Sequence, residues 1–309
     1  MVSQEHFYQD GYALCQGVLN NSMMGALRSD LREYSRLGRN PYIYESKTIQ
    51  SVVFGAQVQN LISQILGDKY IFLPDYSFNA VDFWSAFGWH KDSVDRYDIN
   101  GADWEDPKFP IIRLGIYLGD YSSKTGSLGI QKASNRGPLY ANPGINVKSK
   151  PGDVVIWPLT TTHTANSPSF KFSPNSALSP AINTKIARAL TNKLGIFANR
   201  TEIGLQENLP NRQVLFFSVG KPGPHLARYM SYLVHREYFR DFIRKDPEQG
   251  EVYSRSSDYS GVNWLKVKSL MEMADKKLIS KEFDQKKAQS ASEVLFSEFM
   301  EVFKHVKPR

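Results

Sequence analysis

Histidines and a nearby carboxylate are the residues of this chain whose types and spacing could hold a catalytic metal. His90 and Asp92 lie two residues apart in FGWHKDS, just after an apolar segment that is expected to be a strand. Iron(II) that must also bind oxygen and an organic co-substrate is commonly held by two imidazoles and one carboxylate on one face, which leaves positions open. One short segment would supply one imidazole and the carboxylate.

His163 is the histidine best placed to complete this set. It ends the segment GDVVIWPLTTTH, which indicates a turn, a strand and a loop that finishes in the imidazole. The long separation from His90 leaves room for several intervening strands, so a distant strand of the same sheet can bring His163 to the first pair. The expected metal ligands are therefore His90, Asp92 and His163.

The other four histidines are less suitable as metal ligands. His235 and Glu237 also spell His-x-acid, but they fall in a helical apolar pattern, where residues two apart point about 200° apart around the axis. His225 is ten residues from His235, on a different face of the same pattern. His6 and His305 lie near the ends of the sequence without a suitable carboxylate. We interpret these four histidines as structural or surface residues.

The elements that must position the ligands show two hydrophobic periodicities. Helical spacing predicts helices over about 3–38, with a turn near Asn20, over 49–66, ending at Gly67, and again after Pro224 and near the end of the chain. Short runs rich in β-branched and aromatic residues predict strands at 70–73, 76–84, 111–118, 128–131, 153–157 and 213–219. Such a series of strands without helices between them is typical of an antiparallel sandwich or barrel. The expected class is mainly β with flanking helices.

No repeat and no clean linker divides the sequence, so we expect one domain over 1–309. Its parts are a helical N-terminal part (1–69), a β core (70–220) and a helical C-terminal part (221–309). A Ser/Pro/Asn-rich stretch, 167–211, interrupts the core and indicates an insertion over one end of the sheet.

Composition excludes few classes but favours a soluble globular protein. The chain is 41% hydrophobic and 22% charged, and it has no run of eighteen apolar residues that would predict a membrane span. Its start is polar and acidic, unlike a secretory signal, and its single cysteine, Cys15, fits a reducing cytoplasm, the expected location. The net charge of +7 is interspersed, without the basic and aromatic patch that would indicate a nucleic-acid partner.

Several segments, in order along the chain, resemble the phytanoyl-CoA dioxygenase family of iron(II)/2-oxoglutarate oxygenases. They are FYQDGYALCQGVLN near the start, which resembles the family's opening helix and strand, WHKD at 89–92, IIRLGIYLGDYSSKTGSLGIQKASNR at 111–136 and KPGDVVIWPLTTTHTANS at 150–167. The resemblance covers about 5–170 and resumes at about 211–236. It implies a double-stranded β-helix, a cupin-like jelly roll with the metal at its open end.

The resemblance also implies iron(II) as the metal and 2-oxoglutarate as a co-substrate whose far carboxylate is held by an arginine. Arg212, which opens RQVLFFSV, is the matching residue, because a guanidinium can bind a carboxylate through two parallel hydrogen bonds. In the family this arginine follows the distal histidine closely, whereas here 167–211 must loop out first, so Arg113 is a second candidate. Asn79 and Tyr117, on strands expected to line the barrel, are further candidates for co-substrate contact.

The implied activity is that of a dioxygenase, most simply a hydroxylase, which uses O2 to oxidise a small organic metabolite of a biosynthetic pathway and releases succinate and CO2. Related halogenases replace the ligating carboxylate with a small residue, so Asp92 favours hydroxylation, desaturation or ring chemistry. Two alternatives stay open. One is a cupin-type metal-dependent enzyme that does not use 2-oxoglutarate, and the other is a jelly-roll binding protein without catalysis.

Overall fold

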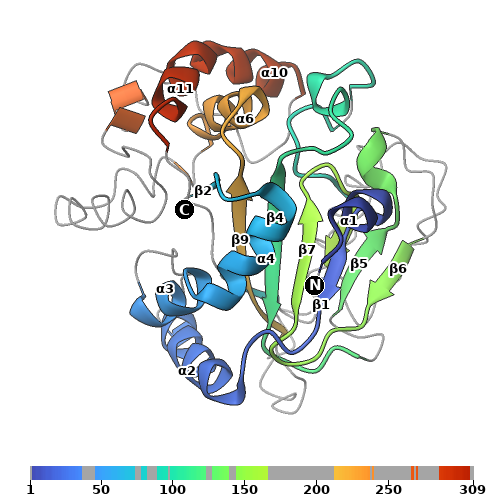
Figure 1. Ribbon diagram of the computed structural model, residues 1–309, viewed down its shortest axis with the longest axis vertical. Coiled ribbons are helices and arrows are strands. Elements are labelled where there is room, and N and C mark those ends of the chain that lie inside the picture. The colour runs from blue at the N-terminus through green and yellow to red at the C-terminus, as the bar shows by residue number, and fades with distance from the viewer. Residues whose placement is uncertain are drawn as a thin grey trace, which may run out of the picture.

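Two antiparallel sheets and several helices make up the computed structural model (Figure 1). It describes residues 2–36, 46–73, 78–81, 89–96, 98–122, 127–138, 144–165, 212–236, 239, 266–267, 269–270 and 285–306. The expected insertion, 167–211, lies outside these residues. Within them, no helix is both long enough and apolar enough to cross a membrane. The architecture is mixed helix and sheet, rather than mainly β.

The larger sheet has the strand order β1-β7-β4-β9-β2, and β3 also pairs with β9. Its strands are β1 (Ala13–Cys15), β2 (Ile71–Phe72), β3 (Phe78–Val81), β4 (Ile111–Tyr117), β7 (Val154–Pro158) and β9 (Arg212–Gly220). The smaller sheet has the order β6-β5-β8, with β5 (Leu128–Gln131), β6 (Gly144–Val147) and β8 (His163–Ala165). All of these pairings are antiparallel, as expected.

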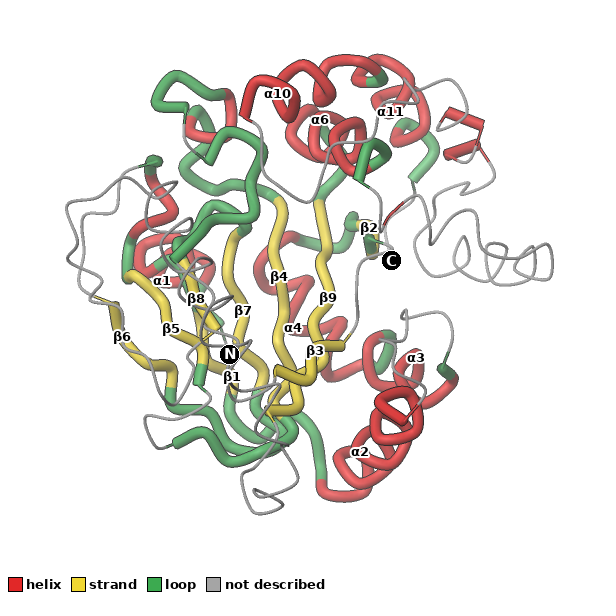
Figure 2. Tube along the Cα trace, turned by 180° about the vertical axis from the view of Figure 1, so that it is seen from behind, coloured by secondary structure: helices red, strands yellow, loops and turns green. Residues whose placement is uncertain are grey.

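The larger sheet has two different faces, because successive residues of a strand point to opposite sides. Ile112 and Leu114 of β4 are fully buried in the core that also contains the N-terminal helices. Tyr117 of β4 and Trp157 of β7 belong to a second core, which they share with Ile130 of β5. The smaller sheet therefore packs over the second face (Figure 2), and helix α4 (Ala56–Leu66) lies over the first.

The N-terminal stretch predicted as helical over 3–38 is wrong in part. Helix α1 (Gln4–Asp10) begins at the N-cap Ser3 and ends at Gly11, whose φ of 76° is left-handed. Strand β1 follows and pairs with β7, and α2 (Asn21–Arg36) comes only afterwards. Three residues of the expected helical part therefore belong to the sheet, because a partner distant in sequence overrides local helical spacing.

The helix predicted over 49–66 consists of two helices, α3 (Lys47–Val53) and α4. The break lies at Gly55, which is extended and begins α4; a Cβ there would lie 2.8 Å from the carbonyl oxygen of Ser51. Gly67 ends α4, as predicted. The predicted strands all coincide with observed ones where they are described, but the short strands β6 and β8 were not predicted.

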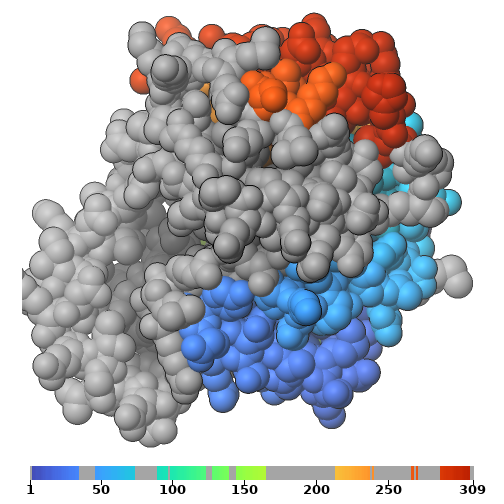
Figure 3. Space-filling model, turned by 90° about the vertical axis from the view of Figure 1, so that its left-hand side faces the viewer, coloured from blue at the N-terminus to red at the C-terminus, as the bar shows by residue number. Residues whose placement is uncertain are grey.

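The C-terminal helices form a separate layer at one end of the larger sheet. They are α6 (Pro224–Leu233), α10 (Gln285–Val294) and α11 (Phe296–Phe303). The Ser231 hydroxyl joins them, since it donates to the carbonyl of Ala291 and accepts from the amide of Leu295. Figure 3 shows these C-terminal residues and the N-terminal helical residues at opposite ends of one side of the molecule.

Candidate metal centre

The segment that carries His90 and Asp92 is bound along its length to the segment that ends in His163. The amide of His90 donates to the carbonyl of His163 (3.0 Å), and the amide of His163 donates back to His90 (2.9 Å). The amide of Asp92 donates to the carbonyl of Leu159 (2.9 Å). In such an extended pairing, residues two apart point to the same side. The backbone therefore presents His90 and Asp92 together to His163.

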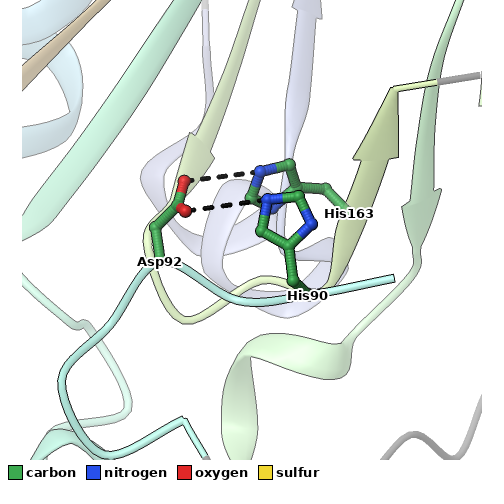
Figure 4. A group of neighbouring side chains, drawn as sticks. All are labelled: His90, Asp92 and His163. Carbon is green, nitrogen blue, oxygen red and sulfur yellow. Dashed lines mark ion pairs between the residues drawn. The ribbon is translucent and has the colours of Figure 1, made fainter. Parts of the chain in front are cut away.

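These three side chains converge on one point (Figure 4). The Nε2 atom of His90 lies 3.7 Å from Oδ1 of Asp92, and Nε2 of His163 lies 3.4 Å from Oδ2. One ligand atom from each residue lies within 4.8 Å of the others. A divalent first-row metal with bonds of about 2.0–2.2 Å needs donors roughly 3 Å apart, so small side-chain rotations would close the set around an ion. The donor set fits such a metal.

A hydrogen bond fixes which nitrogen of His163 can bind a metal. Its Nδ1 lies 3.0 Å from the carbonyl oxygen of Thr161. Because a carbonyl only accepts, Nδ1 carries a proton and donates it, so Nε2, which faces Asp92, is the nitrogen left to bind a metal. His163 is only 5% exposed, so its ring is held firmly in this orientation.

Asp92 is kept ionised by its neighbours. Burial alone would raise the pKa of its carboxyl, but the guanidinium of Arg113 and the imidazoles of His163 and His90 outweigh burial and hold this pKa well below its usual range. The Nη1 atom of Arg113 lies 2.7 Å from Oδ2 of Asp92, and Nε donates to the hydroxyl of Ser218 (3.1 Å). An anionic ligand is therefore available over the whole physiological pH range.

The structure brings Arg113 to the three ligands but places Arg212 at the other end of the sheet. Arg113 of β4 pairs with Ser218 of β9, whereas Arg212 begins β9 and pairs with Val81. Six residues of strand, at about 3.3 Å each, separate Arg212 from Ser218, which is roughly 20 Å. The backbone of Arg212 thus belongs to the end of β9 that is remote from Asp92; its side chain lies outside the described residues.

The two other candidates for co-substrate contact have different surroundings. Tyr117 is fully buried, and its ring packs against those of Tyr121 and Phe216, with centroids 5.7 and 6.4 Å away. Such packing is that of a core residue between the two sheets. Asn79 pairs with Val214 in the same sheet, and its side chain is not among those described.

His235, of the second His-x-acid pair, does not lie in the helix in which it was expected. Helix α6 ends at Leu233, so His235 lies in the following turn, where it is buried, and the helical geometry expected for it was wrong. Glu237 lies outside the described residues. The ring of His225 packs on Phe109 (5.2 Å), and burial lowers its pKa. In the described part of the chain, the group of metal-ligating side chains is His90, Asp92 and His163.

The residues that orient the ligands were not found from the sequence. The carbonyl of Thr161 sets the tautomer of His163, and Arg113 was considered only as a co-substrate anchor, although it contacts Asp92. The signal for Arg113 was its place on an apolar strand, IIRLGIYL, where a charged residue needs a buried partner. No sequence signal marks a backbone carbonyl.

No protein-family model matches this chain, and no curated protein matches it either. Among solved structures, it is similar to HygX from Streptomyces hygroscopicus with nickel and 2-oxoglutarate bound (15% identity, 71% of this chain and 85% of that one, TM-score 0.49). It is also similar to SnoN, a non-heme alpha ketoglutarate dependent epimerase from nogalamycin biosynthesis (12%, 71% and 81%, 0.46). A third is ThoJ, a non-heme monooxygenase, as its nickel complex (14%, 72% and 78%, 0.47). The phytanoyl-CoA dioxygenase family stays a prediction.

Proposed function

We propose that this chain is an iron(II)/2-oxoglutarate-dependent oxygenase that oxidises, most simply hydroxylates, a small organic metabolite. The observation that carries the proposal is the convergence of His90, Asp92 and His163, with one ligand atom of each within 4.8 Å of the others. Two imidazoles and one carboxylate leave coordination positions open, as non-haem iron(II) oxygenases require. The segments that supply them are far apart in the chain and are brought together by their paired backbones.

The chain's own residues would hold and prepare the metal. Nε2 of His90, Nε2 of His163 and Oδ1 of Asp92 are the ligating atoms, and Arg113 holds the other carboxylate oxygen. Iron(II) and 2-oxoglutarate, when bound, supply the oxidising power of O2, with release of succinate and CO2. The protein contributes ligand geometry, a mostly buried site and the positions of co-substrate and substrate.

For the far carboxylate of 2-oxoglutarate we favour Arg212 over Arg113. The guanidinium of Arg113 already contacts Asp92 and Ser218, so it serves the metal ligand. Arg212 begins β9 of the same sheet, at the opposite end from Ser218, and a guanidinium can bind a carboxylate through two parallel hydrogen bonds. In this arrangement the side chain of Arg212 and the extended co-substrate would together have to span the length of β9 between Arg212 and Ser218.

The same proposal includes a jelly roll. Its two walls would be the six-stranded and three-stranded antiparallel sheets, which share the core around Tyr117, Trp157 and Ile130. The metal ligands would lie at the end where β7 leads through residues 159–162 into β8. A biosynthetic, cytoplasmic role is part of this proposal: the biosynthetic role comes from the breadth of the family that the sequence resembles, and the single cysteine, Cys15, fits a reducing cytoplasm.

Formation of succinate tests the proposal. Purified protein with Fe(II), ascorbate, 2-oxoglutarate and O2 is expected to produce succinate slowly even without the substrate. His163→Ala should abolish this production, whereas His6→Ala, at an exposed histidine, should leave it unchanged. Succinate at equal rates in the parent and in His163→Ala would contradict the proposal. A parent that binds metal but forms no succinate would favour the cupin-type alternative.

A further inference from the structure

Lys91, between the two ligands of the HKD segment, is completely buried. Its relative exposure is 0%. Lysine is almost never fully buried unless its charge is paired, because desolvating an ammonium is costly. In an extended segment, Lys91 points away from the side that carries His90 and Asp92. A buried lysine directly behind a metal site calls for a physical explanation.

Two backbone carbonyls receive the ammonium of Lys91. Its Nζ donates to the carbonyl oxygen of Thr160 at 2.7 Å and to that of Ser134. The ring of Trp104 lies beneath it, with the centroid 5.4 Å from Nζ, close enough for a cation–π contact. In addition, Nη1 of Arg96 donates to the carbonyl of Lys91 itself (2.9 Å), which fixes the backbone at this position.

Most backbone carbonyls of the loop that leads to His163 accept a hydrogen bond from a backbone amide. The carbonyl of Leu159 accepts from the amides of Asp92 and Ser93, and that of Thr162 accepts from the amide of Gln131. The carbonyl of His163 accepts from the amide of His90. Each of these carbonyls has a backbone donor, and buried carbonyls must be satisfied.

The two remaining carbonyls of this loop accept from side chains. The Thr161 carbonyl accepts from Nδ1 of His163, and the Thr160 carbonyl accepts from Lys91. Thr160, Thr161 and Thr162 are all fully buried, so water cannot readily replace a lost donor. Lys91 therefore satisfies the carbonyl of Thr160, the residue directly before Thr161, whose own carbonyl sets the tautomer of His163.

Lys91 also joins this loop to a third segment. Ser134, whose carbonyl accepts from Lys91, uses its hydroxyl to accept from the amide of Thr162 (2.8 Å) and to donate to the carbonyl of Gln131 (2.6 Å). The ammonium thus bridges the segment with His90 and Asp92, the loop before His163 and the turn at Ser134. These contacts hold the two halves of the ligand set at a fixed separation.

We propose that Lys91 is a positioning residue, which sets the metal affinity of the site by fixing the loop 159–162 relative to His90 and Asp92. The inference rests on the proposed metal site and adds a residue that does not touch the metal. Residues that orient metal ligands typically change metal affinity 10–100-fold when they are replaced. Loss of the ammonium should cause an effect of this size.

The test is titration with Co(II), whose visible absorption reports both affinity and ligand geometry. Lys91→Met keeps the length of the side chain but removes the donors, and its affinity should fall 10–100-fold with an altered spectrum. Lys91→Gln keeps N–H donors on a shorter stem, and its affinity should lie between those of the parent and Lys91→Met.

Arg28→Met is the matched control. Arg28 also donates to a backbone carbonyl, that of Leu118 (2.9 Å from Nε), beyond the end of β4 opposite Arg113. This variant should lose thermal stability without a change in Co(II) affinity or spectrum.

The possible outcomes separate the inference from the proposed function. Parent and Lys91→Met with equal affinities and spectra, even if the variant is less stable, would overturn the role of Lys91 alone. No Co(II) uptake by the parent would overturn the metal site and this inference with it. If Lys91→Met does not fold, Lys91→Gln decides: a weakened affinity with an altered spectrum supports positioning through the donors, and a parental affinity or a parental spectrum contradicts it.

Discussion

The buried acid pair Asp95 and Asp103 should make the stability of this protein depend on pH. The two side chains are 0% and 2% exposed, and they share one guanidinium, that of Arg228 of α6. Each carboxylate also accepts from the other residue's amide, at 2.8 and 3.1 Å. One shared cation cannot fully offset two buried negative charges, so burial and then the charge of Asp95 raise the pKa of Asp103 to about 7.

The size and sign of the effect follow from linkage. A carboxyl whose pKa is raised on folding binds its proton more tightly in the folded state, so its contribution to stability is present at low pH and is lost as the pH rises through the folded value. In the unfolded chain its pKa is about 3.9. Between pH 5 and pH 8 the protein should therefore lose about 2–3 kcal/mol of unfolding free energy from the titration of Asp103, at about 1.36 kcal/mol per pKa unit.

The assay compares the parent with Asp103→Asn by urea denaturation at pH 5 and pH 8. Asparagine carries no titrating proton, so the variant lacks this pH dependence. Its unfolding free energy should fall short of the parent's at pH 5, and this shortfall should be about 2–3 kcal/mol smaller at pH 8. Glu5→Gln, at an exposed residue of α1, controls for the loss of one acidic residue. A difference between Asp103→Asn and parent that is the same at both pH values would refute the reasoning.

Two further predictions concern the co-substrate and the backbone. Arg212→Met should raise the KM for 2-oxoglutarate about 10–100-fold, because hydrogen bonds to a charged group contribute about 1.5–3 kcal/mol, while Co(II) affinity stays at the parental value; steady-state kinetics showing a parental KM would contradict it. Gly11→Ala should lower the unfolding free energy by more than about 1 kcal/mol, since φ is 76° and the new Cβ would lie 2.7 Å from Oδ1 of Asn135. Gly25→Ala, in α2 with open space around it, should instead raise stability by about 0.5–1 kcal/mol. Thermal denaturation measures both variants, and a stabilised Gly11→Ala or a destabilised Gly25→Ala would show the backbone argument to be wrong.

Much of the site was predictable because its signal lies in residue types and local patterns. A histidine two residues before an aspartate presents both side chains on one side of an extended segment, and the strand before TTTH gave a second histidine at a plausible strand end. These local patterns predicted three residues that the structure brings together. The predicted strands β4, β5 and β9 were found for the same reason, since their apolar runs reflect burial on one or both faces.

The parts that were missed depend on partners that are distant in the sequence. Strand β1 has only three residues, and its strand conformation comes from pairing with β7; the family resemblance implied a strand in this segment, but no periodicity near Ala13 indicates it. Likewise the contact of Arg113 with Asp92 follows from the register of β4 against β7 and β9. No local pattern singles out Lys91, and only the coordinates place it against the carbonyl of Thr160.

The absorption spectrum of the protein with Fe(II) and 2-oxoglutarate under anaerobic conditions is the most direct test of the central claim. If His90, Asp92 and His163 hold iron with open positions for the co-substrate, a metal-to-ligand charge-transfer band should appear in the visible range only when both are added. The band should be absent from His163→Ala and retained in His6→Ala. A parent protein without the band, or His163→Ala with the same band as the parent, would contradict the account.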